Sequence, residues 1–330
     1  MAKTDLKYEK QNLLASFFGK KYGEFLYSGT LAVETALIST EIKPGDYVLI
    51  PNNVCYRILL SLARLKVIPI IVTPQNGYVL TEFEIMKALE QFPVKAIILV
   101  HNLGLPVDIA AIKEICDNRV EIIEDAAQAW DIKCKGNSIG KSSDYVITSF
   151  GISKPLSLGV GGAIFSNDEK FRHLIDNYDN NSRVSDRLLL PYTLPVAVKF
   201  DVSKLINIAD NNVFHQRSIA NVLIKELKNM GLNFWELYDD DNPTWHRFPV
   251  WTDSQELFNN LITQADRYHV KYELPHKITL DNTPMAISLN SIHMDYSEKK
   301  YYHILIKTRQ NLLVNIRKWT KIIKSKNLKK

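Results

Sequence analysis

The chain has 330 residues, of which 46% are hydrophobic and 23% are charged, and its net charge at pH 7 is +5. This is the composition of an ordinary globular protein, and the length indicates one large or two modest domains. Part of the positive charge comes from lysines between residues 321 and 330, which is typical of a solvated helix end. We therefore expect no nucleic-acid partner.

The first residues are polar and lack the apolar core of a secretion signal, and no apolar run approaches the roughly 18 residues of a membrane span. We therefore expect a cytoplasmic protein without a membrane partner. The three cysteines, Cys55, Cys116 and Cys134, do not have the spacing of metal ligands, and their number is odd. Both features argue against a disulfide framework and against a metal site.

Short apolar runs alternate with amphipathic stretches between residues 25 and 175. The runs are apolar throughout, which is typical of strands that are covered on both faces. This pattern predicts an α/β fold with a mostly parallel sheet, in which ligands collect at the carboxyl ends of the strands. The predicted strands are residues 47–51, 67–72, 96–100, 121–125, 145–150 and 162–166, and the predicted helices are residues 30–40, 56–66, 81–91 and 109–118.

The remainder of the chain reads differently. Residues 176–200 are polar and interrupted by prolines, which predicts an irregular connection. A helical pattern follows from about residue 202 to 230 and is stopped by Gly231. The last hundred residues mix short strands with a final helix near residues 307–325, which indicates a smaller α+β domain.

The first segment that could belong to a functional site is YSGT, residues 27–30, directly before a predicted helix. The free backbone amides at such a helix start, here near Gly29 and Thr30, suit a phosphate group. A plain helix cap would explain the same residues. The second segment is HNLGLPVD, residues 101–108, where His101 either lines a site or is a buried structural histidine.

The third segment, EDAAQAW, follows a predicted strand and places Asp125 at its carboxyl end, with Gln128 three residues on. Asp125 would pair with a protonated ring nitrogen there, or cap the next helix. The fourth segment, residues 149–162, is a glycine-rich loop that carries Ser149 and Lys154 after another strand. A desolvated lysine in such a loop can form an imine with an aldehyde cofactor. Its glycines precede a strand, which excludes a dinucleotide-binding fingerprint.

The order and spacing of these segments resemble those of the DegT/StrS-type aminotransferases, often called the sugar aminotransferase family. The connecting segments PGDYVLIP (44–51), HNLGLPVD (101–108) and GGAIFSNDEKF (161–171) are also similar to segments of that family. The resemblance covers residues 25–175 and becomes faint from residue 176 onward.

The resemblance implies the type I fold of aminotransferases that use pyridoxal 5'-phosphate (PLP). This fold has a large α/β domain with a mostly parallel, seven-stranded sheet, followed by a small α+β domain. We expect the large domain to cover residues 1–200, including the irregular connection 176–200, and the small domain to cover residues 201–330. The resemblance also implies a homodimer.

The resemblance further implies a role for each motif residue. Lys154 would carry PLP as a Schiff base and would later move a proton between substrate and cofactor. Asp125 would pair with the pyridine nitrogen and keep it protonated, and Gln128 would contact the cofactor near its phenolic oxygen. The residues that would hold the phosphate are Gly29, Thr30 and Ser149.

Two features of the chain depart from the family pattern. The side chain that covers the PLP ring is usually aromatic, and its position falls on Cys55, with Tyr56 as the alternative. The family also carries a GYNYR-like motif after the lysine loop, and the local match at residues 190–195 has Pro and Thr where Asn and Arg are expected. We expect substrate contacts from Tyr56, from His101, and from Arg183 or Arg187 of this connection.

The implied function is transfer of an amino group from an amino acid, with glutamate as the expected donor, to a keto-sugar. The sugar would be nucleotide-linked and destined for bacterial surface polysaccharide. One alternative is PLP-dependent dehydration or deoxygenation of a sugar, which Lys154 opposes because relatives of that kind replace the lysine. Another is a catalytically retired binding protein, which the altered GYNYR-like motif favours and the intact cofactor motifs oppose.

Overall fold

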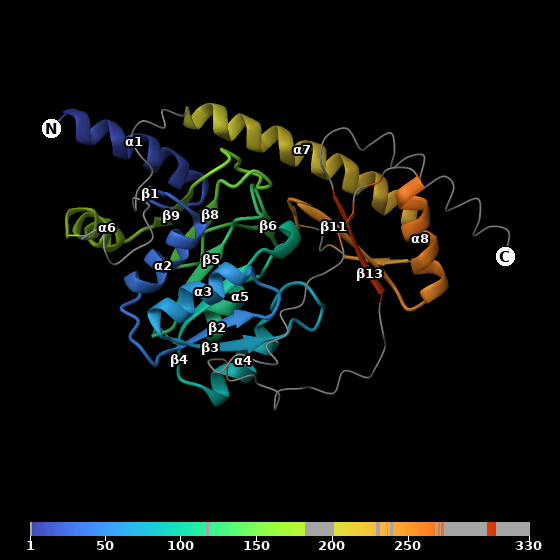
Figure 1. Cartoon of the computed structure of the whole chain (residues 1–330), viewed down its shortest axis with the longest axis horizontal. Coiled ribbons are helices and arrows are strands. Elements are labelled where there is room, and N and C mark those ends of the chain that lie inside the picture. Colours follow the sequence, from blue (N-terminus) through green and yellow to red (C-terminus); the bar gives the residue numbers. More distant parts are fainter. Residues whose placement is uncertain are drawn as a thin grey trace.

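The computed structural model describes residues 2–116, 119–181, 201–228, 232–235, 237, 240–267, 270, 272–273 and 302–307. These residues form two larger β-sheets that lie side by side, with one long helix running along both (Figure 1), and a separate two-stranded sheet. Among the described helices, none combines the length and the apolar character that crossing a bilayer requires.

The larger sheet has seven strands in the order β1-β9-β8-β5-β4-β2-β3. Its strands pair in parallel from β3 through β8, and β9 runs antiparallel to both of its neighbours. This confirms the predicted α/β class with a mostly parallel sheet. The strands are β1 (Tyr22–Leu26), β2 (Tyr47–Pro51), β3 (Ile68–Val72), β4 (Val94–Val100), β5 (Glu121–Asp125), β8 (Tyr145–Ser149) and β9 (Gly162–Ser166).

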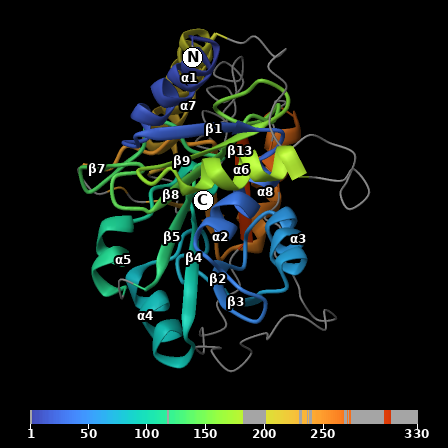
Figure 2. The same cartoon turned by 90° about the vertical axis from the view of Figure 1, so that its left-hand side faces the viewer.

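Helices cover both faces of this sheet, as continuous apolar strands require (Figure 2). Along β4, alternate side chains enter different cores: Ile97 and Leu99 join one apolar cluster, and Ile98 joins the other. The first cluster contains residues of α4 (Glu82–Gln91) and α5 (Ile109–Ile115), and the second contains residues of α2 (Gly29–Ser39) and α3 (Tyr56–Leu65).

The smaller sheet has four antiparallel strands in the order β10-β11-β13-β12. Helix α8 (Gln255–Arg267) contacts β11 and β13. The predicted final helix, residues 307–325, lies outside the described residues except for Lys307, which is the last residue of a strand. The strands are β10 (Asn233–Phe234), β11 (Arg247–Thr252), β12 (Tyr272–Glu273) and β13 (Tyr302–Lys307), and a separate hairpin pairs β6 (Lys133–Cys134) with β7 (Asn137–Ser138).

Three helices complete the described part of the chain: α1 (Ala2–Phe17), α6 (Lys170–Asn181) and α7 (Val202–Leu227). Because α6 continues to Asn181, the first six residues of the predicted connection 176–200 are helical, and the others lie outside the described residues. The first half of α7 belongs to an apolar cluster with residues of β1, β8 and β9 in the large sheet. Its second half belongs to the apolar cluster that contains residues of both sheets. The domain boundary at residue 200 therefore stays a prediction.

Candidate active site

Three segments meet at one edge of the large sheet, where the parallel strands β5 and β8 end and helix α2 begins. The backbone continues the ladder just beyond β5, where the Ala126 amide donates to the Ile147 carbonyl at 2.8 Å. Ser28 pairs with Gly161 in an isolated bridge next to β9. The sheet topology thus brings together the segments that carry Gly29, Asp125 and Ser149, as the sequence predicts.

The start of α2 forms a tight cradle. Ser28 caps the helix by accepting the Leu31 amide at 3.2 Å, so the amides of Gly29 and Thr30 have no acceptor within the helix. A Cβ on Gly29 would lie 3.0 Å from the Ser149 Cβ, and a Cβ on Gly162 would lie 2.6 Å from the Gly29 nitrogen. Any other residue at either glycine would fill the space beside these amides. The cradle therefore fits an oxyanion such as the PLP phosphate.

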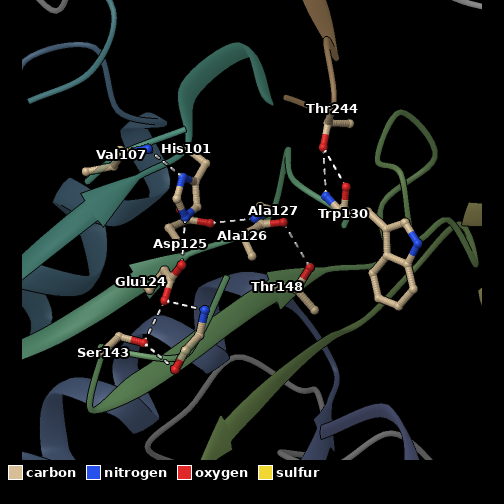
Figure 3. A network of polar contacts seen from close by, with 11 residues as sticks. His101, Val107, Glu124, Asp125, Ala126, Ala127, Trp130, Ser143, Thr148 and Thr244 are labelled. Atoms are coloured by element: carbon tan, nitrogen blue, oxygen red, sulfur yellow. Dashed lines mark hydrogen bonds and ion pairs between the residues drawn. The ribbon is translucent and has the colours of Figure 1, made fainter. Parts of the chain in front are cut away.

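Asp125 is the last residue of β5 and is 7% exposed. Its Oδ1 accepts the Ala127 amide at 2.8 Å (Figure 3), and in the described part of the chain its Oδ2 accepts no hydrogen bond. Burial raises the pKa of this carboxyl, while the Ala127 amide and the positive charge of Lys154 oppose the shift. A buried carboxylate of this kind is stabilised by a cationic ligand group, and the protonated pyridine nitrogen of PLP is one.

Lys154 lies in a turn after β8 and is half-buried. The turn is held by its own amide, which donates to the Gly151 carbonyl at 2.9 Å. Burial lowers the pKa of the Lys154 ammonium, and the negative charge of Asp125 opposes the shift. A lysine with a lowered pKa more readily gives the neutral amine that condenses with an aldehyde.

Gln128 is clamped by the short helix η1 (Asn102–Gly104). Its Oε1 accepts the Leu103 amide at 3.1 Å, which fixes the orientation of the side-chain amide, and its Nε2 donates to Asn102 Oδ1 at 3.3 Å. Nε2 carries two hydrogens, so one is left for a ligand. Asn102 was missed in the sequence, since nothing in the pattern indicates which loop holds Gln128.

His101 is a buried structural residue with 1% exposure. Its Nδ1 accepts the Val107 amide at 3.1 Å, and its Nε2 lies 2.7 Å from Glu124 Oε1 (Figure 3). Since Nδ1 acts as an acceptor, Nε2 carries the hydrogen and donates it to Glu124. Both ring nitrogens are engaged inside the protein, which favours the structural alternative for His101, and its contact with substrate stays a prediction.

Cys55 and Tyr56, the two candidates for the position that covers the PLP ring, are both exposed, and they differ in their electrostatic effect on Lys154. The thiol of Cys55 lies close enough to Lys154 to influence its ionisation, whereas Tyr56 is 60% exposed and stacks near Arg57. This effect favours Cys55 over Tyr56, and the ring-covering role of Cys55 stays a prediction. The predicted substrate residues Arg183 and Arg187, and the match to the GYNYR-like motif, lie outside the described residues.

A further charged residue approaches the site from the small sheet. Arg247, at the start of β11, adds to the lowering of the Lys154 pKa by its positive charge. Sequence patterns did not indicate this residue, because a single arginine in a distant strand carries no motif. Its position depends on how the two sheets meet.

Ser149→Ala is expected to weaken PLP binding by roughly 10- to 100-fold, because a hydrogen bond to a charged phosphate is worth about 1.5–3 kcal/mol. The Ser149 hydroxyl borders Gly29 at the cradle. Spectroscopic titration of the apo-protein with PLP measures the change. Ser157→Ala is the matched control, because that hydroxyl bonds the Ile152 carbonyl in the same loop. Equal affinity of both variants would show that Ser149 does not hold the phosphate.

Glu124→Gln is expected to lower the free energy of unfolding by about 2–4 kcal/mol. The carboxylate accepts three donors: His101 Nε2, the Gly140 amide at 2.9 Å and the Ser143 hydroxyl at 2.6 Å. A glutamine amide would direct N–H groups against at least one of these donors. Urea unfolding of the apo-protein measures the loss.

The pH dependence of this loss follows from the ionisation of Glu124. Burial favours the neutral acid, but bonding and charge from His101, with the bonds from Ser143 and Gly140, outweigh it and leave the pKa of Glu124 lowered. Such a group stabilises the fold above its unfolded pKa, and the contribution is lost as pH falls through the folded pKa. The deficit of Glu124→Gln should thus shrink below about pH 4. Glu121→Gln, on the same strand, should cost little, since burial raises the pKa of Glu121.

The comparison with known proteins agrees with this geometry. A family model described as the DegT/DnrJ/EryC1/StrS aminotransferase family matches residues 3–288. The dTDP-3-amino-3,6-dideoxy-alpha-D-galactopyranose transaminase of Aneurinibacillus thermoaerophilus is 27% identical over 278 residues, which are 80% of this chain and 75% of that protein. The dTDP-3-amino-3,4,6-trideoxy-alpha-D-glucose transaminase of Streptomyces venezuelae is 28% identical over 75% of this chain and 68% of its own length.

Solved structures show the same fold. A DegT DnrJ EryC1 StrS aminotransferase from Brucella abortus superposes with a TM-score of 0.77 at 19% identity, over 98% of this chain and 92% of the other. DesV of S. venezuelae superposes with a TM-score of 0.75 at 21% identity, over 95% and 88% of the two chains. The predicted aminotransferase fold is therefore confirmed.

Proposed function

The chain belongs to the DegT/DnrJ/EryC1/StrS aminotransferase family, and from this premise we propose that it moves an amino group from glutamate to a nucleotide-linked keto-sugar. It is a PLP-dependent sugar aminotransferase. The donor, the carrier nucleotide and a role in bacterial surface polysaccharide belong to the proposal. Support for the sugar nucleotide comes from the relatives, whose names include dTDP-, UDP- and GDP-linked amino sugars.

One observation carries the proposal: the half-buried Lys154 and the buried Asp125 lie within electrostatic reach of each other in the space beside the cradle at the start of α2. A lysine and an acid in such a space match the two ends of PLP, its aldehyde carbon and its ring nitrogen. PLP supplies an electron sink for the carbon that gains or loses the amino group.

Each of the site residues has a separate role in this proposal. Gly29, Thr30 and Ser149 would hold the phosphate of PLP. Asp125 would keep the ring nitrogen protonated. Lys154 would hold the cofactor through Nζ and would move the proton that the reaction requires. The intact lysine favours amino transfer over dehydration, and the intact set favours an enzyme over a retired binding protein.

The direct test uses the absorbance of the PLP-loaded protein before and after addition of glutamate alone. We expect the spectrum of the lysine-bound cofactor to be replaced by that of pyridoxamine phosphate, with release of one 2-oxoglutarate per site. Borohydride reduction followed by peptide mapping should place the cofactor on Lys154. A label on another lysine, or no spectral change with any amino acid, would refute the proposal.

The proposal includes a homodimer. The segments around Lys154 expose apolar side chains, including Ile152 at 79% and Tyr56 at 60%, and a second copy of the chain would cover them. Light scattering of the PLP-loaded protein should give a dimer that resists dilution, and Ile152→Asp should weaken it at least tenfold. Phe83→Asp, at an exposed site on α4, is the control. A monomer that retains PLP would contradict the expectation.

A further inference from the structure

Two side-chain amides and one backbone amide form a closed group of hydrogen bonds just beyond the end of β4. The Leu103 amide donates to Asn102 Oδ1 at 3.0 Å and to Gln128 Oε1 at 3.1 Å, and Gln128 Nε2 donates to Asn102 Oδ1 at 3.3 Å. These bonds determine which end of each side-chain amide is the oxygen, because turning either amide over would bring its NH2 group against another N–H group. Asn102 Oδ1 therefore accepts two donors from segments that lie 26 residues apart.

The backbone of η1 takes an uncommon conformation in making these contacts. Leu103 has a φ of 60°, in the left-handed region, which bulky residues rarely adopt. Such a conformation persists only where the surrounding structure determines it. Here the Leu103 amide is held by its two acceptors, and the Gly104 amide donates to the His101 carbonyl at 3.0 Å. The loop is thus fixed in a shape that presents Asn102 to Gln128.

The position of Gln128 along the sheet edge indicates which part of the cofactor it faces. The cradle lies beside the ends of β8 and β9, Asp125 ends β5, and η1 follows β4, so the strand of Asp125 lies between the cradle and η1. PLP bears its phosphate arm and its phenolic oxygen on opposite sides of the axis from its ring nitrogen to its aldehyde carbon. With the phosphate in the cradle and the ring nitrogen at Asp125, the phenolic oxygen faces the side of Gln128.

Gln128 has a donor available for that oxygen. Its side chain is half-buried, whereas Ala126 and Ala129 on either side are buried, and one hydrogen of Nε2 is not used by Asn102. A free glutamine side chain samples several rotamers, and fixing one of them opposes binding. Because Asn102 and the Leu103 amide already fix Gln128, its remaining N–H is oriented before a ligand arrives.

We infer that Asn102 is a positioning residue of the active site, which orients Gln128 so that the second N–H of Nε2 meets the phenolic oxygen of PLP. The inference rests on the proposed function, in which the phosphate occupies the cradle and Asp125 pairs with the ring nitrogen. Asn102 is assigned no contact with cofactor or substrate of its own, and it acts through Gln128.

The charge on the phenolic oxygen is the property that this donor changes. When PLP is bound to Lys154, negative charge on that oxygen helps to hold a proton at the neighbouring Nζ. An N–H group from Gln128 draws off part of the charge and so weakens the hold on the proton. If Gln128 loses its orientation, the proton should be held more tightly, and the absorbance of the cofactor should change at a higher pH.

The test is a double-mutant cycle on the PLP-loaded protein, made of Asn102→Leu, Gln128→Met and the double variant. Leucine has nearly the shape of asparagine without an acceptor, and methionine replaces the glutamine amide with an apolar chain. Asn12→Leu is the matched control. Asn12 Oδ1 also accepts two donors, the Gly23 amide at 3.3 Å and Arg172 Nη2 at 2.6 Å, at the end of β1 that lies away from the cradle. The readouts are the pH midpoint of the absorbance and the PLP affinity, and circular dichroism reports folding.

Asn102→Leu should raise the pH midpoint by roughly 0.4–1 unit, the shift that one hydrogen bond produces, and should weaken PLP binding by roughly 2- to 10-fold. Gln128→Met should shift the midpoint at least as far. In the Gln128→Met background, Asn102→Leu should add no further shift, because its effect passes through the glutamine. Asn12→Leu should leave the midpoint unchanged.

Asn102→Ser decides the question by the same criteria if the leucine variant folds poorly. Its hydroxyl can still accept the Leu103 amide, which keeps the loop, but it is too short to reach Gln128. An unchanged midpoint in a folded Asn102 variant would overturn the inference, as would a shift that persists in full when residue 128 is methionine.

Failure of the proposed function has a separate signature in the wild-type protein. A wild type without PLP on Lys154, or without conversion of PLP by glutamate, would refute the proposed function and with it the role of Asn102. Normal conversion by the wild type, together with an Asn102 variant of unchanged midpoint, would refute the role of Asn102 alone.

Discussion

Replacing Lys154 with alanine is expected to reduce transamination by roughly 10⁴-fold or more while leaving the fold intact. Lys154 is a half-buried amine within electrostatic reach of Asp125, and in its proposed role its loss would remove both the covalent anchor for PLP and the group that moves the proton. The turn that carries it is held by backbone hydrogen bonds, which the substitution does not touch. The loss of activity is measured as the rate of 2-oxoglutarate release from glutamate at saturating PLP.

The control separates the two tasks of the lysine. Added methylamine, a small primary amine, should restore part of the activity of Lys154→Ala by replacing the proton carrier, whereas it should not accelerate the wild-type enzyme. Lys141→Ala, at an exposed lysine before β8, should retain full activity. Near-normal turnover of Lys154→Ala without added amine would assign the chemistry to another group.

The sequence predicted the strands that are buried on both faces, and the reason is physical. The apolar runs at β2, β5 and β9 match the predicted strands residue for residue. Strand β1 was missed because its sequence, YGEFL, interrupts the apolar run with Gly and Glu. Glu24 is nevertheless buried, and its Oε1 accepts a hydrogen bond from Gln11 Nε2 of α1 at 2.9 Å, which offsets part of the cost of burying the carboxylate. Helix α1 was missed with it, because its polar start resembles an unstructured end.

The site residues also divide into those that the sequence predicts and those that it does not. Asp125, Ser149 and Gly29 were predictable because parallel topology gathers residues that follow strands at one edge of the sheet. His101 follows a strand too, yet its ring turns inward to Glu124, and the sequence does not indicate which way a side chain rotates. Arg247 was not predictable, since its approach depends on the contact of Thr244 with η1, far away in the sequence.

Asp125→Asn is expected to reduce turnover by roughly a hundredfold or more, while PLP still binds. An asparagine can accept the Ala127 amide as the aspartate does, so the local structure is kept and only the negative charge is lost. A neutral amide cannot hold the ring nitrogen protonated. Asp108→Asn is the matched control, because Asp108 is a true cap of α5 and accepts the Ala111 amide at 3.1 Å. The residues after Asp125 form a turn rather than the helix that the alternative assumes, so equal activity of the two variants would leave Asp125 only the structural role of accepting the Ala127 amide in that turn.

The same variant should not destabilise the apo-protein. Burial raises the pKa of Asp125, so the folded state binds its proton more tightly than the unfolded state does. A raised pKa contributes stability below the unfolded value near 3.9, and that contribution is lost as the pH rises through the folded pKa. At neutral pH the buried charge therefore costs stability until a cation arrives, and Asp125→Asn removes this cost. Urea unfolding at pH 7 without PLP should give a midpoint at or above that of the wild type. With PLP the order should reverse, because only the aspartate gains from the positive ring nitrogen.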